Sequence, residues 1–259
     1  PLISGNYILW CPNLLEFSVP TLVKTADTLA IPSGFLRQLS SYHGHQTLNT
    51  LALSGFKEVT KIGDHFIYHF KSLKNINLKP LSSVISVGDS FLSYDKALTN
   101  LDFSPLSNLE TVGKYFLSGC NFTTLDLSAL SNIKTFGSGF LEYNSLLTEV
   151  KLPNHMKVTQ ISENVMEVFK SLKSVDLSCF SDVTEIKNNF FSECIALESI
   201  DMSPFVAITT IGVNFLWRVN SLSTINMGTI DPDVLSGDSN FIAYLTEDEY
   251  DNWEGFALT

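Results

Sequence analysis

The sequence is short of positive charge. Its 259 residues include 16 Lys and Arg against 27 Asp and Glu, which gives a formal net charge of −11. A nucleic-acid-binding protein normally carries basic side chains that neutralise phosphates. The composition therefore argues against a nucleic-acid partner, and it is compatible with a basic protein partner.

The sequence also lacks any long apolar run. No stretch approaches the roughly 18 uninterrupted apolar residues of a membrane-spanning helix, so we expect no insertion into a membrane. Phosphate-binding loops, G-x-S-x-G and H-E-x-x-H motifs and dinucleotide-binding glycine patterns are all missing. We therefore expect a protein that is not an enzyme, with no catalytic residues and no cofactor.

What the sequence does contain is a repeat of about 25 residues. The stretch "LTNLDFSPLSNLETVGKYFLSGC" is followed by "FTTLDLSALSNIKTFGSGFLEYN" and later by "LESIDMSPFVAITTIGVNFLWRV". Units that match L-x-x-[LIV]-x-[LFM] begin at Leu48, Leu73, Leu98, Phe122, Leu147, Leu172, Leu197 and Leu222. This spacing predicts a solenoid of stacked units, because no single unit could bury its apolar residues alone.

Each unit predicts the same local structure. In the unit that begins at Leu98, Leu101 and Phe103 flank a polar residue, which predicts a short strand with one buried face. Pro105 then ends the strand, because proline has no N–H to give to a ladder. Neighbouring strands are expected to form one parallel sheet.

Two further columns recur in the units. The Gly column is expected where φ is unusual or where backbones approach closely; it comprises Gly63, Gly88, Gly113, Gly137 and Gly212. The aromatic column follows it and comprises Phe66, Phe91, Phe116, Phe140, Phe190 and Phe215. The spacing around the aromatic column is compatible with a short helix or 3₁₀ turn opposite the strands.

The unit resembles a leucine-rich repeat of the BspA-like, or treponemal, class. Val112-Gly113…Phe116…Cys120 and Ile211-Gly212…Phe215 carry the resemblance. It implies an α/β leucine-rich-repeat solenoid with a parallel β-sheet on the concave face and short helical or 3₁₀ segments opposite. It also implies a scaffold for protein recognition, often in surface proteins, without catalytic residues.

We divide the chain into two parts. Residues 1–227 are the predicted solenoid of about nine units, with a partial first unit and an insertion within residues 14–47. Residues 228–259, where the pattern fades, are the predicted C-terminal capping segment that covers the last apolar layer. Because the chain begins in mid-repeat, we expect it to be a fragment of a longer repeat array.

The main candidate contact residues lie on the predicted strands. Each of six units places an acidic or amide residue between two apolar strand residues, and together these form the Asp/Asn column: Asn77, Asp102, Asp126, Asp176, Asp201 and Asn226. Three interpretations remain open: a solubilising face, a surface for a protein partner, or a cation site that relieves the crowding of like charges.

The insertion supplies further candidates. Residues 36–47 are expected to form an exposed loop in which Tyr42, His43 and His45 contact a partner, unless the insertion is merely tolerated. His43, His45 and His69 could also converge as a zinc site, although no cysteine or carboxylate completes a recognisable ligand spacing.

The four cysteines are expected to be free thiols packed as small apolar groups. Cys120 and Cys194 occupy the same position three units apart, which is beyond the reach of a disulfide. Cys11 shares that position, and Cys179 lies in a different column.

We therefore predict a non-catalytic protein-binding scaffold that uses its concave polar face and the 36–47 loop. The alternatives are a structural spacer or subunit of a large assembly, an intracellular effector scaffold and, more remotely, a metal-binding protein that uses the histidines. The resemblance alone favours an extracellular or cell-surface antigen or adhesin over a cytoplasmic protein, and the sequence leaves the compartment undecided.

Overall fold

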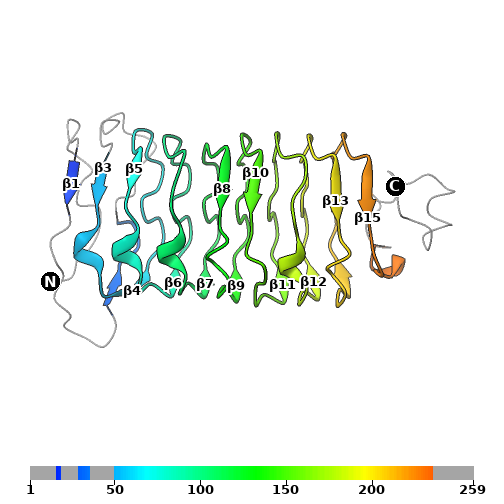
Figure 1. Ribbon diagram of the computed structural model, residues 1–259, viewed down its shortest axis with the longest axis horizontal. Coiled ribbons are helices and arrows are strands. Elements are labelled where there is room, and N and C mark those ends of the chain that lie inside the picture. The colour runs from blue at the N-terminus through cyan, green and yellow to red at the C-terminus, as the bar shows by residue number, and fades with distance from the viewer. Residues whose placement is uncertain (1–15, 19–28, 36–49, 236–259) are drawn as a thin grey trace.

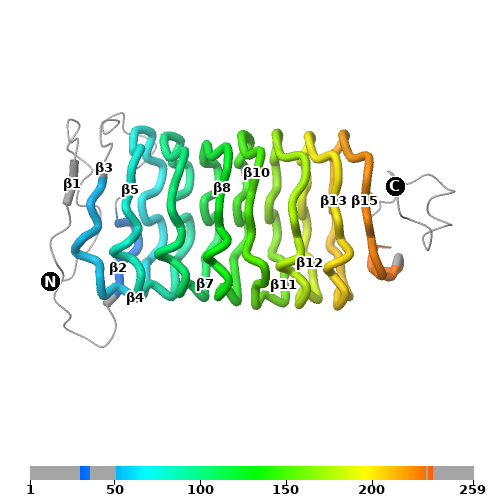
Figure 2. The backbone as a smooth tube through the Cα atoms, viewed as in Figure 1, coloured from blue at the N-terminus to red at the C-terminus, as the bar shows by residue number. Residues whose placement is uncertain are grey.

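The computed structural model describes residues 16–18, 29–35 and 50–235. Through these residues the chain winds as a solenoid, and equivalent parts of consecutive units lie side by side along its axis (Figures 1 and 2). The predicted stacking of units is therefore confirmed. The predicted concave shape of the strand side is not confirmed, since the units follow a straight axis in Figure 1.

One side of the solenoid carries the predicted strands. They are β1 (Glu16–Ser18), β3 (Thr50–Ala52), β5 (Asn75–Ile76), β8 (Thr124–Asp126), β10 (Glu149–Lys151), β13 (Ser199–Asp201) and β15 (Thr224–Asn226). Pairing is parallel and in register, so that Leu125 of β8 aligns with Val150 of β10 and both are buried. A single continuous sheet was predicted, and this is wrong, because residues 100–102 and 174–176 form no strand. Within the described residues this side therefore has three sheets, with orders β1-β3-β5, β8-β10 and β13-β15.

A second side carries strands that the sequence did not predict. They are β2 (Leu29–Ile31), β4 (Val59–Ile62), β6 (Ser86–Val87), β7 (Thr111–Val112), β9 (Thr135–Phe136), β11 (Gln160–Ile161), β12 (Glu185–Ile186) and β14 (Thr210–Ile211). They pair in parallel in the orders β2-β4-β6-β7-β9 and β11-β12-β14. Most are two residues long, with one residue outside and one buried, as in Thr111 and Val112. Strands this short leave no alternation in the sequence for a prediction to use.

Helix is confined to short 3₁₀ segments. Within the described residues these are η1 (Ser54–Phe56), η2 (Lys79–Leu81), η3 (Ser104–Leu106), η4 (Ser178–Phe180) and η5 (Pro232–Leu235). The first four follow the strand side directly, and Pro80 and Pro105 stand near the starts of η2 and η3, where a missing N–H costs nothing. No α-helix occurs in the part of the chain that the structure describes. The predicted α/β class is therefore corrected to a parallel-strand β-solenoid.

The segment around the aromatic column, predicted to be helical, has a backbone of alternating handedness. Ser90, Leu92 and Tyr94 have φ values of 60°, 52° and 59°, and the equivalent residues of the following units repeat the pattern. The N–H of Tyr94 donates to the carbonyl of Ser118 in the next unit, whereas the N–H of Leu92 donates to Phe66 in the preceding one. Each segment thus bonds to both neighbours, which satisfies groups that a helix would pair internally. We call these segments the left-handed ladder.

The aromatic column forms the predicted internal stack. The rings of Phe91 and Phe116 lie 5.6 Å apart with 8° between their planes, and those of Phe116 and Phe140 lie 5.5 Å apart at 6°. All three side chains are buried, and the burial of each contributes about 1.5–3 kcal/mol to the stability of the fold.

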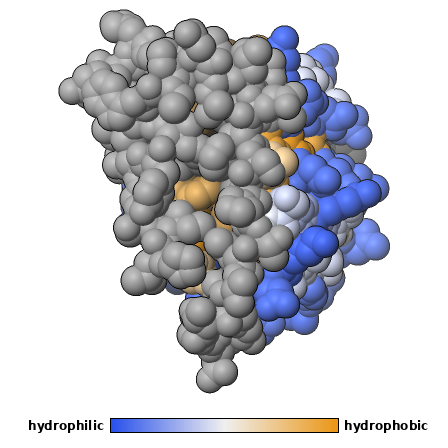
Figure 3. Space-filling view, turned by 90° about the vertical axis from the view of Figure 1, so that its left-hand side faces the viewer, coloured by the Kyte–Doolittle hydropathy of each residue, from blue (hydrophilic) through white to orange (hydrophobic). Residues whose placement is uncertain are grey.

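The end view of the solenoid separates polar from apolar side chains. Seen from the N-terminal end, hydrophilic side chains follow one outer edge and hydrophobic ones show toward the middle (Figure 3).

The Gly column marks a close approach of backbones, one of its two predicted roles. A Cβ at Gly113 would lie 2.4 Å from the carbonyl carbon of Gly88, and one at Gly137 would lie 2.6 Å from the backbone nitrogen of Lys114. These glycines do not have the positive φ of the left-handed ladder. The fold therefore requires glycine at these positions because glycine has no Cβ, and not because its backbone is free to adopt a positive φ.

Candidate interaction surface

The strands of the first side create a polar outer surface, which we call the strand-lined face. On β8 and β10 the middle residue is buried and its two neighbours are exposed. This follows from the two-residue period of a strand, which points alternate side chains to opposite sides. Each unit therefore offers two outward side chains, of which the second belongs to the Asp/Asn column.

All six members of the Asp/Asn column are exposed, as predicted from the sequence. The structure adds a local role, because each accepts a hydrogen bond from the backbone N–H two residues later. Oδ1 of Asp102 accepts from Ser104 at 2.9 Å, and Oδ1 of Asn77 accepts from Lys79 at 3.0 Å. The same bond joins Asp126 to Ser128, Asp176 to Ser178, Asp201 to Ser203 and Asn226 to Gly228. These are Asx turns, in which the side chain of the column residue stabilises the chain where it leaves the strand side.

The same contacts favour the charged form of three of these aspartates. Hydrogen bonds from the Ser104 side chain and backbone lower the pKa of Asp102, and those from Ser128 lower the pKa of Asp126. The backbone and side chain of Ser178 do the same for Asp176. Hydrogen bonds to a carboxylate favour its charged form. Along the face, Lys151 on β10 lies 3.5 Å from Asp126 on β8 and offsets part of this charge.

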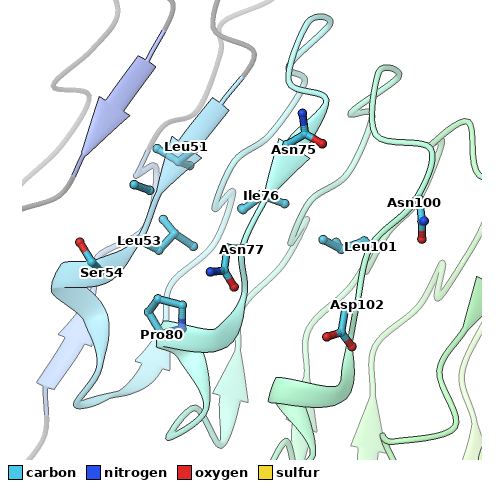
Figure 4. Close-up of a pocket in the computed structure, with 11 residues that line it drawn as sticks. Leu51, Leu53, Ser54, Asn75, Ile76, Asn77, Pro80, Asn100, Leu101 and Asp102 are labelled. Atoms are coloured by element: carbon cyan, nitrogen blue, oxygen red, sulfur yellow. The ribbon is translucent and has the colours of Figure 1, made fainter.

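The strand-lined face is hollowed between β3, β5 and residues 100–102 (Figure 4). The hollow has a volume of about 490 Å³. Its apolar lining includes Leu51, Leu53, Ile76 and Leu101, and its polar lining includes Asn75, Asn77, Asn100 and Asp102. Asn77 and Asp102 belong to the predicted column. Asn75 and Asn100 were not predicted, although their shared position in consecutive units was a usable signal.

The predicted loop contacts Tyr42, His43 and His45 lie outside the described residues. The third histidine of the suggested zinc site, His69, stacks on Tyr94 with ring centroids 6.0 Å apart. Burial lowers the pKa of His69, and Lys71 and Lys96 lower it further. Within the described ranges, no group of three or more His, Cys, Asp or Glu side chains is arranged to hold a metal ion.

Three cysteines, Cys120, Cys179 and Cys194, are buried free thiols, as predicted. Burial raises the pKa of Cys179 and of Cys194 to about 12, so neither is a thiolate at neutral pH. Sγ of Cys120 donates to the carbonyl of Leu92 at 3.1 Å. These thiols are packing groups, and Cys11 lies outside the described residues.

A second charged feature, on the left-handed ladder, was missed by the sequence reasoning. Glu142, Glu167 and Glu193 come from three consecutive units, and Glu193 pairs with Arg218 at 3.3 Å. Burial raises the pKa of Glu167 to about 7, with Glu142 and Glu193 adding to the rise. Glu142 and Glu167, 25 residues apart, were a signal for part of this contact, whereas Glu193 lies one position further along its unit.

Among the described residues, no helix combines the length and apolarity needed to cross a lipid bilayer. The geometry defines a class: a repeat solenoid with an ordered polar face. The family model described as BspA type leucine rich repeat region matches residues 28–146, 60–180 and 127–237, and the chain belongs to this family. The resemblance noted in the sequence is thus confirmed.

A search of curated protein sequences found no match. Among solved structures, the chain is similar to a leucine-rich repeat protein from Bacteroides ovatus, with a TM-score of 0.55 and 17% identity over 82% of this chain. The match spans 63% of that protein, just under two thirds of its length. At this identity the likeness shows the fold alone.

The functional domain of InlJ from Listeria monocytogenes, a structure that includes a cysteine ladder, also matches. Its TM-score is 0.34 and its identity 15%, over 83% of this chain and 54% of that one.

Proposed function

We propose that this chain is a non-catalytic protein-binding module that presents its strand-lined face to a protein partner. The observation that carries the proposal is the Asp/Asn column, in which six exposed side chains are held in one orientation by Asx turns. A rigid, repeated polar surface suits extended contact with another protein. Leucine-rich repeats are commonly protein-interaction scaffolds, which supports the same conclusion.

The charge of the face favours a basic partner. The Ser contacts lower the pKa of Asp102, Asp126 and Asp176, so these side chains stay negative at neutral pH. The chain as a whole carries a formal net charge of −11. Complementary charge accelerates association and selects among partners more than it adds affinity. The 36–47 loop is part of the proposed contact, and residues 228–259 are proposed to cap the solenoid.

The test uses substitutions that remove charge and keep the turns. Asp102→Asn, Asp126→Asn, Asp176→Asn and Asp201→Asn are combined in one variant, because Asn77 and Asn226 already make the same Asx turn in this chain. A matched control removes four carboxylates that are not on the strand-lined face: Glu58→Gln, Glu110→Gln, Glu163→Gln and Asp182→Asn.

Both variants and the unaltered chain are used as bait in an extract of the native source. We expect the unaltered chain and the control variant to capture the same partner protein. The four-Asn variant should capture that protein poorly. Equal capture by all three would move the contact to another surface. A chain that co-purifies only within a fixed large assembly would instead support the structural-subunit alternative.

A further inference from the structure

The hollow on the strand-lined face is bordered by amide side chains with unused hydrogen-bonding capacity. Asn75 and Asn100 occupy the same position in consecutive units, both are exposed, and neither side chain has a hydrogen-bond partner among the described residues. Asn77 uses only its Oδ1 in the Asx turn to Lys79, which leaves its amide NH₂ group for another contact.

The main chain beside the hollow is also unpaired. The N–H and C=O groups of residues 100–102 form no hydrogen bond to another main-chain group within the described part of the chain. The equivalent residues of β3 and β5 do pair with each other. The hollow therefore lies where the parallel ladder stops, next to backbone groups that are not committed to a neighbouring strand.

The two rows that border the hollow run in the strand direction (Figure 4). Asn75 and Asn77 flank Ile76 in one row, and Asn100 and Asp102 flank Leu101 in the other. Residues two apart on a strand are separated by about 6.6 Å, which is also the distance at which an extended peptide repeats the direction of its main-chain amides. A side-chain amide offers a donor and an acceptor in one plane, as a peptide group does.

The rest of the lining narrows the class of ligand. A volume of about 490 Å³ lies within the usual range of ligand sites, about 300–1,000 Å³. None of the described residues that line it is aromatic, so it offers no flat ring for stacking. Asp102 is the charged lining group, and Lys79 lies close enough to lower its pKa. A site with a single carboxylate and several amides around an apolar floor fits a peptide main chain better than an ion.

We propose that the hollow binds an extended peptide segment of a partner protein, which lies between the two rows and pairs its main-chain amides with Asn75, Asn77 and Asn100. One apolar side chain of the peptide rests on Ile76 and Leu101. This inference rests on the proposed function, because it assigns part of the contact with the protein partner to this hollow.

The test is selection of a random seven-residue peptide library on the immobilised chain, followed by titration calorimetry with the enriched peptide as a synthetic probe. We expect Asn75→Ala combined with Asn100→Ala to weaken binding by about tenfold or more, as the loss of two hydrogen bonds predicts. Ala52→Trp should also weaken it, because Ala52 lines the hollow and is exposed, and the larger ring would fill the space.

The matched control is Thr124→Ala combined with Ser174→Ala, which alters the same strand position in units away from the hollow. Thermal unfolding verifies that every variant is folded. The proposal is overturned if no peptide is enriched, or if the enriched peptide binds the Asn and Ala52 variants as tightly as the control. Loss of glycan-array binding in the Asn variant, without peptide binding, would make the hollow a saccharide site.

The extract experiment separates this outcome from the wider proposal. The unaltered chain and the Asn75→Ala, Asn100→Ala variant could capture the same partner equally well. That result would show that the hollow is not the contact, while the protein-binding function would still hold. Absence of any captured partner would count against the function itself.

Discussion

Oδ1 of Asp102 accepts the backbone N–H of Ser104 at 2.9 Å, and the same contact recurs between Asp176 and Ser178. The side chain that we propose to face a partner is therefore also the one that makes the Asx turn of its unit. The structural role and the proposed recognition role fall at one position of the repeat, and they can be separated by substitution because asparagine retains the turn while removing the charge.

Asp176→Ala should destabilise the chain by about 0.5–1.5 kcal/mol, the usual net contribution of one hydrogen bond. Asp176→Asn should cost distinctly less, since the amide oxygen can accept the same N–H. Urea unfolding of both variants measures the difference. Equal losses for the two would show that the charge, not the turn, stabilises this position.

Gly113→Ala should destabilise the chain by about 1–3 kcal/mol, the cost of forcing extra volume into a packed interior. The added Cβ would lie 2.4 Å from the carbonyl carbon of Gly88. This is a backbone atom, so the clash cannot be relieved by the movement of a flexible side chain. Lys187→Ala is the control, because Lys187 occupies the same repeat position and already has a Cβ. A Gly113→Ala protein as stable as the control would contradict the close approach.

Phe116→Ala should cost about 3–5 kcal/mol, as large-to-small changes of buried aromatics do. Its ring is stacked between Phe91 and Phe140, so the cavity would open between units and weaken their coupling. Phe116→Leu should cost less than half as much, since Val165 shows that the column accepts an aliphatic residue. Chemical denaturation followed by circular dichroism compares the two, and similar losses would argue against a continuous stack.

Glu167 should make stability depend on pH. Its pKa is raised from 4.5 to about 7 by burial and by Glu142 and Glu193. Between these values the folded chain binds more protons than the unfolded chain, so the free energy of unfolding falls as pH rises through this window. Glu167→Gln should remove that fall, and its advantage over the unaltered chain should grow up to about pH 7 and then level off.

Urea unfolding of both proteins at several pH values between about 5 and 8 measures this advantage. Glu163→Gln, a neighbouring exposed glutamate, is the control. An advantage of Glu167→Gln that does not change with pH would show that neither burial nor the two neighbouring glutamates disfavour the charged form of Glu167 in the folded chain.

Several features could be predicted because they are local and periodic. The repeat length, the buried strand residues and the aromatic column all follow from apolar side chains recurring in each unit, as at Phe91 and Phe116. The exposure of the Asp/Asn column follows from the strand period. Its Asx turns were overlooked, although the recurring Asp-x-Ser spacing of Asp126 and Ser128 carries that signal.

The left-handed ladder could not be predicted from periodicity. Leu92 has a φ of 52° and its N–H bonds to Phe66 in the preceding unit, whereas spacing alone suggested a helical turn. Side chains on a segment of alternating handedness recur at intervals that a short helix also allows. Glycine and asparagine at Gly139, Asn164 and Asn189 were the available hint, because these residues tolerate positive φ.

The sequence by itself determined that this chain is a stack of equal units and which side chains fill the interior, because apolar burial repeats with the unit and needs no knowledge of its neighbours. Only the tertiary structure decided which units pair as strands and where the parallel pairing stops at residues 100–102. It also decided that a hollow lies there, bordered by amide side chains that have no hydrogen-bond partner among the described residues. Those features depend on hydrogen bonds between units, and such bonds are set by the spacing of neighbouring backbones, which no pattern within a single unit specifies.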